Sequence, residues 1–380
     1  MTLYALCIFA ALNNALKAGG NVTLLLAALS LQASPALVGA LTAVGSVLPA
    51  LLAVSIGQLN DRFGARLPLF AGSALVIVSA LLPPLWPGLP ALFVTAILIG
   101  LGSTAFALST QSVVGLFGAP GDRVRNFSWL SIGFSSGAIV GPVFAGFAID
   151  FTGHADTFVL LAFLPVAALL VTGTGQLVLP PPRAARDKAG AAGGRASARR
   201  AIDLFRDRNL RTVYLLTALH VSAWEVSAFL VPVYGASIGL AATSIGVILG
   251  VFSAATFFVR IAMPYFSRRF SALGLIRASL VLAGVIFMLF PLGSSMPVLA
   301  ALAFVLGMGL GVTQPLAMAV LHESAPHGRT GEAVGLRTAV VNLTAATTPL
   351  AYGALGSALG MTPVFWGIAL ALWAAVWAVG

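Results

Sequence analysis

The 380-residue chain carries little charge, because only 8% of its residues are Asp, Glu, Lys or Arg while 59% are hydrophobic. A soluble domain has about 25% charged residues. So few charges cannot cover a surface that faces water, and the hydrophobic side chains must therefore face lipid as well as one another. The composition excludes an ordinary soluble domain and predicts an integral membrane protein.

Residues that would support several kinds of chemistry are also scarce. Cys7 is the only cysteine, so no disulfide can form within the chain. The four histidines are scattered, and no cluster of Cys, His or carboxylates has the spacing of a metal site. The sequence has no phosphate-binding Gly-x4-Gly-Lys-Ser/Thr loop and no convincing nucleophile elbow. We therefore expect no metal, no cofactor and no enzyme activity.

The chain has an excess of basic residues, with a formal net charge of +10. Most Lys and Arg lie in short stretches between apolar segments, which is typical of cytoplasmic loops and not of a nucleic-acid surface. We therefore expect a lipid bilayer and no nucleic acid as a partner. The first residues include no basic region and no clear cleavage site, so we expect a first membrane helix there and not a removable signal peptide.

Twelve apolar runs are each long enough to cross a bilayer, which takes about 20 residues of helix. The runs lie near residues 3–29, 36–59, 67–86, 90–116, 126–149, 157–179, 210–236, 243–266, 273–293, 297–321, 331–356 and 362–379. They are too long for barrel strands and lack the two-residue alternation that such strands need. The sequence therefore predicts an all-α membrane protein with twelve transmembrane helices.

Basic residues between these runs indicate the orientation. If the N-terminus is cytoplasmic, every loop that holds Lys or Arg is cytoplasmic, and the opposite loops carry only Asp150 and Asp156 as charged residues. Basic residues are retained on the cytoplasmic side of a membrane. We therefore expect a multi-pass protein of a bacterial inner (plasma) membrane with both termini in the cytoplasm.

A stretch rich in Pro, Ala, Gly and Arg separates the first six runs from the last six. Residues 180–209 are typical of a flexible linker that lies on an anionic leaflet. The sequence thus predicts an N-terminal six-helix bundle at 1–179, this cytoplasmic basic linker, and a C-terminal six-helix bundle at 210–380.

The two bundles resemble each other in sequence. A shift of 207 residues places Arg62 on Arg269 and Pro142 on Pro349, and these matches fall at equivalent helix ends. Parallel repeats of six helices are one architecture of secondary transporters. We therefore expect two pseudo-symmetric bundles.

The loop after the second run carries a motif of Gly, Asp, Arg and Gly followed by a basic residue. In this sequence the motif consists of Gly57, Asp61, Arg62, Gly64 and Arg66. It resembles the signature loop of the major facilitator superfamily, both in its residues and in its place between the second and third runs. The match departs at Ala65, where the family often has a basic residue.

The resemblance implies the fold of that family and a conformational latch at this loop. An aspartate there can lie against the positive N-terminal end of another helix, and an arginine can pair with an acid such as Asp122. The implied docking point is the start of the eleventh run, near Gly331. The alternative is a solvated charged turn that serves only to orient the chain.

The fifth run contains small residues and a proline. Gly137, Gly141, Pro142 and Gly146 resemble a glycine–proline motif of the family's exporters, especially proton-coupled drug antiporters, although Ala145 replaces one glycine. Small residues let helices approach closely, and proline can bend a helix. We therefore expect these four residues to act in helix packing or gating. The alternative is general helix packing that carries no information about transport direction.

Ionisable residues inside a membrane helix cost several kcal/mol unless they face a cavity or a partner. Lys17 lies near the middle of the first run, in a polar stripe with Asn13 and Asn21 at four-residue spacing, and Asn14 lies beside it. Glu225 lies near the middle of the seventh run, which is equivalent to the first. We expect Lys17, Glu225 and the three asparagines Asn13, Asn14 and Asn21 to contact the substrate or the coupling ion. The proposed relation between the two charged residues is across the central cavity. A structural ion pair between them is the alternative.

Further polar and aromatic residues are candidates for the same cavity. Near Glu225 they are His220 and Trp224, and on later runs they are Gln314 and Asn342. Packing between helices is the alternative for each of these side chains. Arg260 and Arg337 lie about two turns inside their runs, and we interpret them as snorkelling toward the cytoplasmic interface.

These observations predict a secondary active transporter that moves a small molecule by alternating access. Proton-coupled efflux is the first hypothesis, motivated by the fifth run. The fourth run lacks the arginine that exporters of this type often carry, which weakens that hypothesis. Uptake or facilitated diffusion of a small, anionic metabolite is the alternative suggested by Lys17. A membrane-embedded enzyme or receptor would need a catalytic set or a signalling domain, and the sequence has neither. We expect a monomer.

Overall fold

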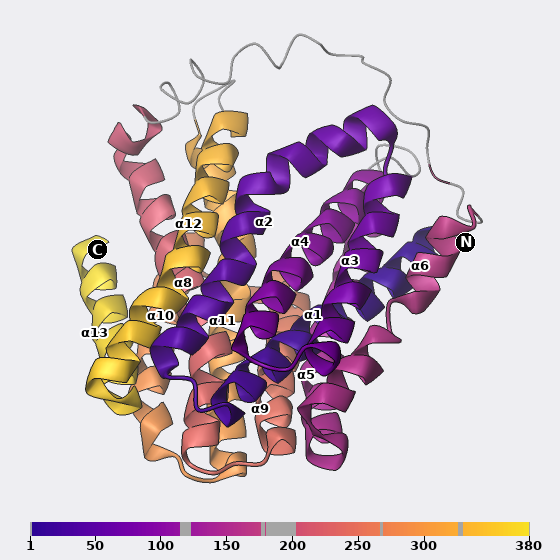
Figure 1. The fold of residues 1–380 in the computed structure, drawn as a ribbon. Coiled ribbons are helices and arrows are strands. Elements are labelled where there is room, and N and C mark those ends of the chain that lie inside the picture. The colour runs from indigo at the N-terminus through magenta and orange to yellow at the C-terminus, as the bar shows by residue number, and fades with distance from the viewer. Residues whose placement is uncertain are drawn as a thin grey trace. The chain divides into compact units, whose positions relative to one another are not determined.

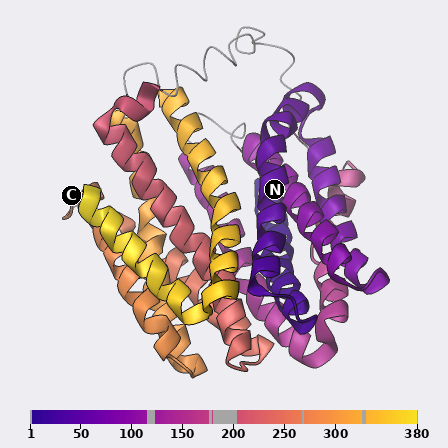
Figure 2. The same ribbon diagram turned by 60° about the vertical axis from the view of Figure 1, so that its left-hand side comes forward.

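The computed structural model describes residues 2–114, 123–175, 179, 203–266, 269–325 and 330–379. These residues form helices, turns and loops, with no strand in the described ranges (Figures 1 and 2). The predicted all-α class is therefore confirmed.

Six α-helices precede the segment of the predicted linker. They are α1 (Thr2–Ser30), α2 (Pro35–Phe63), α3 (Arg66–Leu85), α4 (Leu89–Val114), α5 (Arg123–Ala162) and α6 (Val166–Gly173). Within α5 the helix breaks at Gly153, whose φ of 85° and ψ of 173° are not helical. This break lies between the fifth predicted run, which ends near residue 149, and the sixth, which begins near residue 157, so the two runs are two helices that meet at Gly153.

The helices that follow begin at residue 203. They are η3 (Asp203–Arg206), α8 (Arg208–Ser237), α9 (Ala242–Phe266), α10 (Ala272–Leu289), η4 (Phe290–Leu292), α11 (Met296–Ser324), α12 (Thr330–Leu359) and α13 (Met361–Val379). Most of the predicted linker lies outside the described residues.

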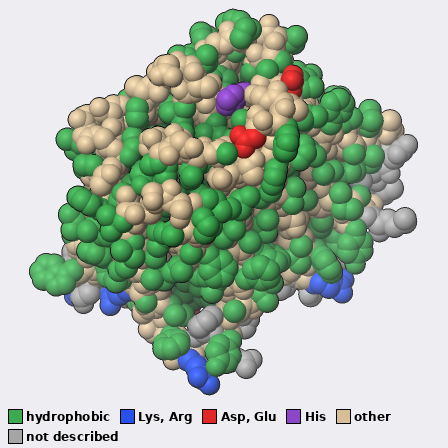
Figure 3. All heavy atoms as spheres, turned by 90° about the horizontal axis from the view of Figure 1, so that it is seen from below, with side chains coloured by type: hydrophobic (Ala, Val, Ile, Leu, Met, Phe, Trp, Pro, Cys, Tyr) green, Lys and Arg blue, Asp and Glu red, His purple; other side chains and the backbone are tan. Residues whose placement is uncertain are grey.

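Eight helical segments among the described residues are long and apolar enough to cross a membrane. They come from α2 to α6 and from α8 to α11, and α13 adds a shorter apolar segment, Met361–Trp377. Large apolar side chains such as Leu85 (81% exposed) cover outward faces of these helices. Figure 3 shows a face of the molecule that is largely hydrophobic and carries few charged side chains. Exposed apolar side chains along the sides of apolar helices fit lipid and not water.

Local sequence explains where several helices begin. Ser34 precedes α2, and its hydroxyl accepts a hydrogen bond from the backbone N–H of Leu37 at 3.4 Å, while Pro35 occupies the first turn. Ser271 precedes α10 and accepts from the N–H of Gly274 at 3.2 Å. Serine is a favoured N-cap residue, and proline is tolerated in the first turn because its position needs no donor.

The chain forms two compact units. The first comprises Met1–Arg186 and Gly235–Gly250, and the second comprises Asp187–Tyr234 and Val251–Gly380. The end of α8 and the first two turns of α9 therefore belong to the first unit. The predicted bundle limits, 1–179 and 210–380 with a linker between them, stay a prediction.

A glycine seam joins α1 and α5 in the first unit. A Cβ atom added to the glycines of α5 at four-residue spacing would collide with carbonyl oxygens of α1: at Gly133 with Cys7, at Gly137 with Ala11 and at Gly141 with Ala15. The backbones of the two helices thus approach more closely than any side chain would allow.

Aromatic packing forms much of the core of the second unit. The rings of Phe290 and Phe365 stack with their centroids 5.3 Å apart, and the Tyr234 ring meets Phe365 edge-on at 5.5 Å. The Tyr234 hydroxyl donates to the carbonyl oxygens of Pro291 and Gly293, at 2.9 and 3.0 Å. This buried tyrosine therefore holds the turn after η4 against α8.

Candidate functional site

The polar stripe of α1 divides into a buried part and an exposed part. Asn13 is only 2% exposed, and its Nδ2 donates to the hydroxyl of Ser73 on α3 at 3.2 Å. The Nδ2 of Asn14 donates to the carbonyl oxygen of Phe134 on α5 at 2.6 Å. Lys17 and Asn21 are exposed. The structure thus separates these two exposed side chains from two asparagines that join helices.

The middle of α8 holds the candidates of the second unit. Glu225 and Trp224 are partly buried, whereas His220 is only 5% exposed and its Nδ1 has no hydrogen-bond partner among the described residues. The ring of Trp224 lies 6.2 Å from that of His220 and 5.0 Å from that of Phe252 on α9. The three rings form an aromatic group on one side of α8.

Two arginines inside the second unit were interpreted from sequence as snorkelling residues. Arg260 of α9 donates from Nε to the carbonyl oxygen of Gly311 at 3.3 Å and from Nη2 to Oε1 of Gln314 at 3.4 Å. Arg337 of α12 is only 8% exposed, and its Nε has no hydrogen-bond partner among the described residues. Arg337 therefore does not reach a water-exposed interface. A charge two turns inside an apolar run was the sequence signal for both residues.

The remaining cavity candidates lie on α11 and α12. Gln314 is exposed apart from its contact with Arg260, and Asn342 is partly buried. Near Asn342, the hydroxyl of Thr348 donates to that of Ser222 at 3.4 Å and joins α12 to α8.

Gly64 gives the predicted latch loop its backbone shape. It ends α2 with φ 80° and ψ 166°, and its N–H donates to the carbonyl oxygen of Asn60 at 2.9 Å. Only glycine adopts this region readily. The side-chain oxygen of Asn60 accepts from the Ser109 hydroxyl of α4 at 3.0 Å, which anchors the end of α2.

The other latch candidates are less completely described. Gly57 lies within α2, and Arg66 begins α3 with an exposed side chain. The side chains of Asp61 and Arg62 and the whole of Asp122 lie outside the described residues.

The small residues of α5 face two neighbours. Gly137 and Gly141 belong to the seam with α1 described above. A Cβ on Gly146 would collide with the carbonyl oxygen of Ala242 at the start of α9, and a Cβ on Gly246 would collide with that of Pro142. All four predicted packing residues thus lie at close helix contacts within the first unit.

Asp150 caps α9 beside this contact. Its Oδ1 accepts from the N–H of Ala242 at 3.1 Å, and its Oδ2 accepts from the N–H of Thr243 at 2.7 Å. A carboxylate at a helix N-terminus satisfies free N–H groups and complements the helix dipole. The sequence indicated Asp150 only as a loop charge, because spacing alone does not reveal which helix end it meets.

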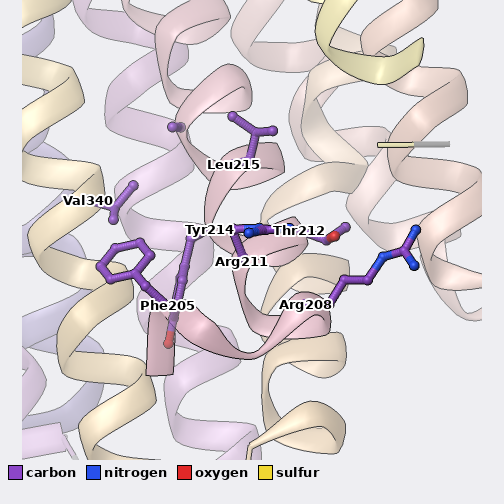
Figure 4. A pocket seen from close by; sticks show the side chains of 8 residues that line it. Phe205, Arg208, Arg211, Thr212, Tyr214, Leu215 and Val340 are labelled. Carbon is purple, nitrogen blue, oxygen red and sulfur yellow. The ribbon is translucent and has the colours of Figure 1, made fainter. Parts of the chain in front are cut away.

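A pocket of about 590 Å³ lies at the start of α8 in the second unit. The side chains of Phe205 and Tyr214 lie toward Val340, and the side chain of Arg208 points away from them (Figure 4). The lining residues are Phe205, Arg208, Arg211, Thr212, Tyr214, Leu215, Ala218 and Val340. The pocket thus combines exposed guanidinium groups with an apolar and aromatic wall.

Comparison of the sequence with known families gives one match that extends over the chain. The family model of the Major Facilitator Superfamily matches residues 4–336 and 213–379.

Curated relatives match over shorter segments. The tetracycline resistance protein, class B, of Escherichia coli is 30% identical over 137 residues, which cover 35% of this chain and 33% of that protein. The human chromaffin granule amine transporter is 30% identical over 151 residues, which cover 38% of this chain and 27% of that protein. The chain therefore aligns with about a third or less of the length of these relatives.

Solved structures resemble the fold over its full length. A mutant of the nucleoside transporter NupG has a TM-score of 0.82 and 15% identity, and each chain is covered completely. The peptide transporter POT in complex with sulfate has a TM-score of 0.81 and 18% identity, with 100% of this chain and 93% of that chain covered. At these identities the likeness concerns the fold alone. With the family match and the helices described above, it leads to one conclusion: the chain is a multi-pass membrane protein that belongs to the major facilitator superfamily of transporters.

Proposed function

We propose that this transporter exports a small molecule in exchange for protons, by alternating access between its two halves. The observation that carries the proposal is the pair of ionisable residues inside equivalent helices, Lys17 of α1 and Glu225 of α8. A charge inside the membrane is expensive and persists where it serves transport. The partial likeness to a tetracycline resistance protein supports the export direction.

Glu225 is the proposed proton carrier. A carboxyl group can take up a proton on one side of the membrane and release it on the other as the cavity changes its access. Lys17 and Asn21 of α1 contact the substrate from the first half. His220, Trp224, Gln314 and Asn342 contact it from the second. Asn13 and Asn14 hold α1 in position through their bonds to α3 and α5.

The loop between α2 and α3 is the proposed conformational latch. Its glycine turn at Gly64 sets the direction of the chain between α2 and α3. The role proposed for the neighbouring charges is to bind the N-terminal end of a second helix. The residues assigned to the latch are Gly57, Asp61, Arg62, Gly64, Arg66 and Asp122. Gly137, Gly141, Pro142 and Gly146 form the surfaces on which α1 and α9 pack against α5 during the transport cycle.

The location of the protein follows from the distribution of its basic residues. We propose that the protein lies in a bacterial inner membrane with both termini in the cytoplasm, because loops rich in Lys and Arg remain on the cytoplasmic side. We also propose that it is a monomer. Its partners are then the small-molecule substrate, protons and lipid.

Uptake or facilitated diffusion of a small anionic metabolite is the second candidate. It is favoured by the exposed ammonium group of Lys17 inside α1, which attracts an anion. The two candidates differ in whether substrate movement releases protons from an acidified compartment.

Everted membrane vesicles from cells that overproduce the protein test the proposal. The vesicles are energised, their interior pH is followed with a quenched dye, and compounds are added from a panel of aromatic acids, amines and antibiotics. We expect at least one compound to release protons from wild-type vesicles and not from Glu225→Gln vesicles. Glu323→Gln is the matched control, since Glu323 is an exposed carboxylate near the end of α11. Equal proton release by wild-type and Glu225→Gln vesicles would remove Glu225 from the coupling path.

A further inference from the structure

The second unit holds two buried basic side chains, Arg337 and His220, and a third, Arg260, that is partly buried. Arg337 and His220 are 8% and 5% exposed, and each has a ring or guanidinium nitrogen without a hydrogen-bond partner among the described residues. The contacts found for Arg260 are with neutral acceptors, the carbonyl oxygen of Gly311 and the amide oxygen of Gln314. A cationic group in a medium of low dielectric constant needs an anion to offset its lost hydration.

Contacts between helices place the three side chains at one level of the unit. The hydroxyl of Tyr214 donates to the carbonyl oxygen of Ala333 at 3.4 Å, so these two positions of α8 and α12 are level. Arg337 lies one turn, about 6 Å, beyond Ala333, and His220 lies about 9 Å beyond Tyr214. The two helices run in the same direction, because the later residues Ser222 and Thr348 also meet.

Arg260, the third side chain, lies at a similar level on α9, which runs antiparallel to α8. The rings of Trp224 and Phe252 meet at 5.0 Å between α8 and α9, which run antiparallel because a short turn joins them. Arg260 lies about 12 Å after Phe252, which brings it level with Thr217 of α8. Both guanidinium groups are near enough to His220 for their charges to act on its imidazole. The hydroxyl of Thr217 is buried there and has no partner among the described residues.

We propose that Arg260, Arg337 and His220 form a binding site for an oxyanion group, a carboxylate or a phosphate, of the transported substrate. Guanidinium groups match the planar or tetrahedral oxygens of such groups through paired N–H donors. The imidazole of His220 and the hydroxyl of Thr217 supply further hydrogen bonds. The inference rests on the proposed transport function, whose substrate class it names.

The surroundings of the site indicate the rest of the substrate. Trp224 lies beside His220 and against Phe252, so an aromatic surface adjoins the basic groups. Aromatic side chains offer a flat apolar surface on which a ring can stack. The site therefore fits an organic anion with an aromatic or apolar body better than a small inorganic anion.

Binding to the purified full-length protein in detergent micelles tests this inference without any ion gradient. The probes are benzoate and phenyl phosphate, with benzamide as the uncharged counterpart and inorganic phosphate as the anion without an aromatic body. Binding is measured by isothermal titration calorimetry up to about 10 mM probe, ten times a Kd of about 1 mM. We expect at least one aromatic anion to bind more tightly than benzamide and inorganic phosphate.

Two substitutions and one control assign the binding to the site. Arg337→Gln and Arg260→Gln should each weaken binding of the aromatic anion by about 10- to 100-fold, the effect of one charged hydrogen bond. Arg337→Lys keeps the charge and should weaken binding less. Arg269→Gln removes the same charge from an exposed arginine of the same unit, which lies 5.1 Å over the Tyr265 ring, and should leave binding unchanged.

Thermal unfolding without ligand separates binding from folding. Arg337→Gln removes a buried charge whose Nε has no hydrogen-bond partner among the described residues, so we expect its Tm to equal or exceed that of the wild type. A lower Tm would assign Arg337 to a structural ion pair and would overturn the inference. So would the absence of binding by every anion, binding that the two Gln variants retain, or equal binding of inorganic phosphate and the aromatic anions. If the anion bound in micelles but no compound released protons in vesicles, the proposed proton coupling would be wrong and the anion-binding site would still be supported.

Discussion

The contact between α1 and α5 predicts the effect of adding one methyl group. In Gly137→Ala the new Cβ would collide with the carbonyl oxygen of Ala11 and lie 2.8 Å from the backbone nitrogen of Ala15 and 3.0 Å from the Cβ of Asn14. Two of these neighbours are backbone atoms of another helix, which cannot rotate away. The helices must therefore separate.

The magnitude follows from two opposing effects. Overpacking of a close contact destabilises by about 1–3 kcal/mol. Replacing glycine by alanine inside a helix stabilises by about 0.5–1 kcal/mol. We therefore expect Gly137→Ala to lower the free energy of unfolding by about 0.5–2 kcal/mol.

The measurement is reversible unfolding of the purified protein in mixed micelles of dodecyl maltoside and dodecyl sulfate. Gly367→Ala is the matched control, because Gly367 lies inside α13 and an added Cβ there meets nothing within 4 Å. The control should be unchanged or slightly stabilised. If Gly137→Ala unfolded at the same detergent composition as Gly367→Ala, the seam would be looser than the structure indicates, and the reasoning would be wrong.

Three further substitutions test other parts of the structure. Glu225→Gln, which cannot take up a proton, should abolish the pH dependence of transport in vesicles between about pH 6 and 8, and an unchanged pH profile would contradict the proton role. Asp150→Ala removes the cap of α9 and should destabilise the protein by about 0.5–2 kcal/mol in thermal unfolding. Asp156→Ala, at an exposed carboxylate of the same element, α5, should have little effect, and equal losses in both variants would argue against a specific cap. Gly64→Ala forces a side chain into a backbone region used almost only by glycine, so the Tm should fall by the equivalent of about 1–3 kcal/mol, and an unchanged Tm would refute that backbone shape.

Much of the fold was predictable from sequence because the bilayer constrains the chain strongly. Backbone groups inside lipid must bond within their own segment, so long apolar runs such as 90–116 become helices. The predicted start of the second run at residue 36 lies within one residue of the start of α2, where Ser34 caps the helix and Pro35 occupies its first turn. The boundary between the fifth and sixth runs also agrees with the structure, because the helix breaks at Gly153, between residues 149 and 157.

The candidate site was less predictable, because spacing groups residues on a helix face without saying what that face meets. Asn13 and Lys17 share a stripe, yet Asn13 is buried against Ser73 while Lys17 is exposed. Burial of Arg337 depends on α8 and other neighbours that are distant in sequence. The sequence did not predict the close contact between Gly133 of α5 and Cys7 of α1, because a glycine alone does not reveal which backbone lies against it.

The most direct test of proton-coupled export uses purified protein in liposomes with an acidic lumen. Labelled aromatic acids, amines and antibiotics are added outside, and uptake is compared with empty liposomes, which accumulate amines passively, and with liposomes that contain Glu225→Gln. The account predicts that at least one compound accumulates above its outside concentration only with the wild-type protein, and that a protonophore abolishes the accumulation. Uptake that stops at equal concentrations, or that the protonophore and Glu225→Gln leave unchanged, would contradict proton-coupled export.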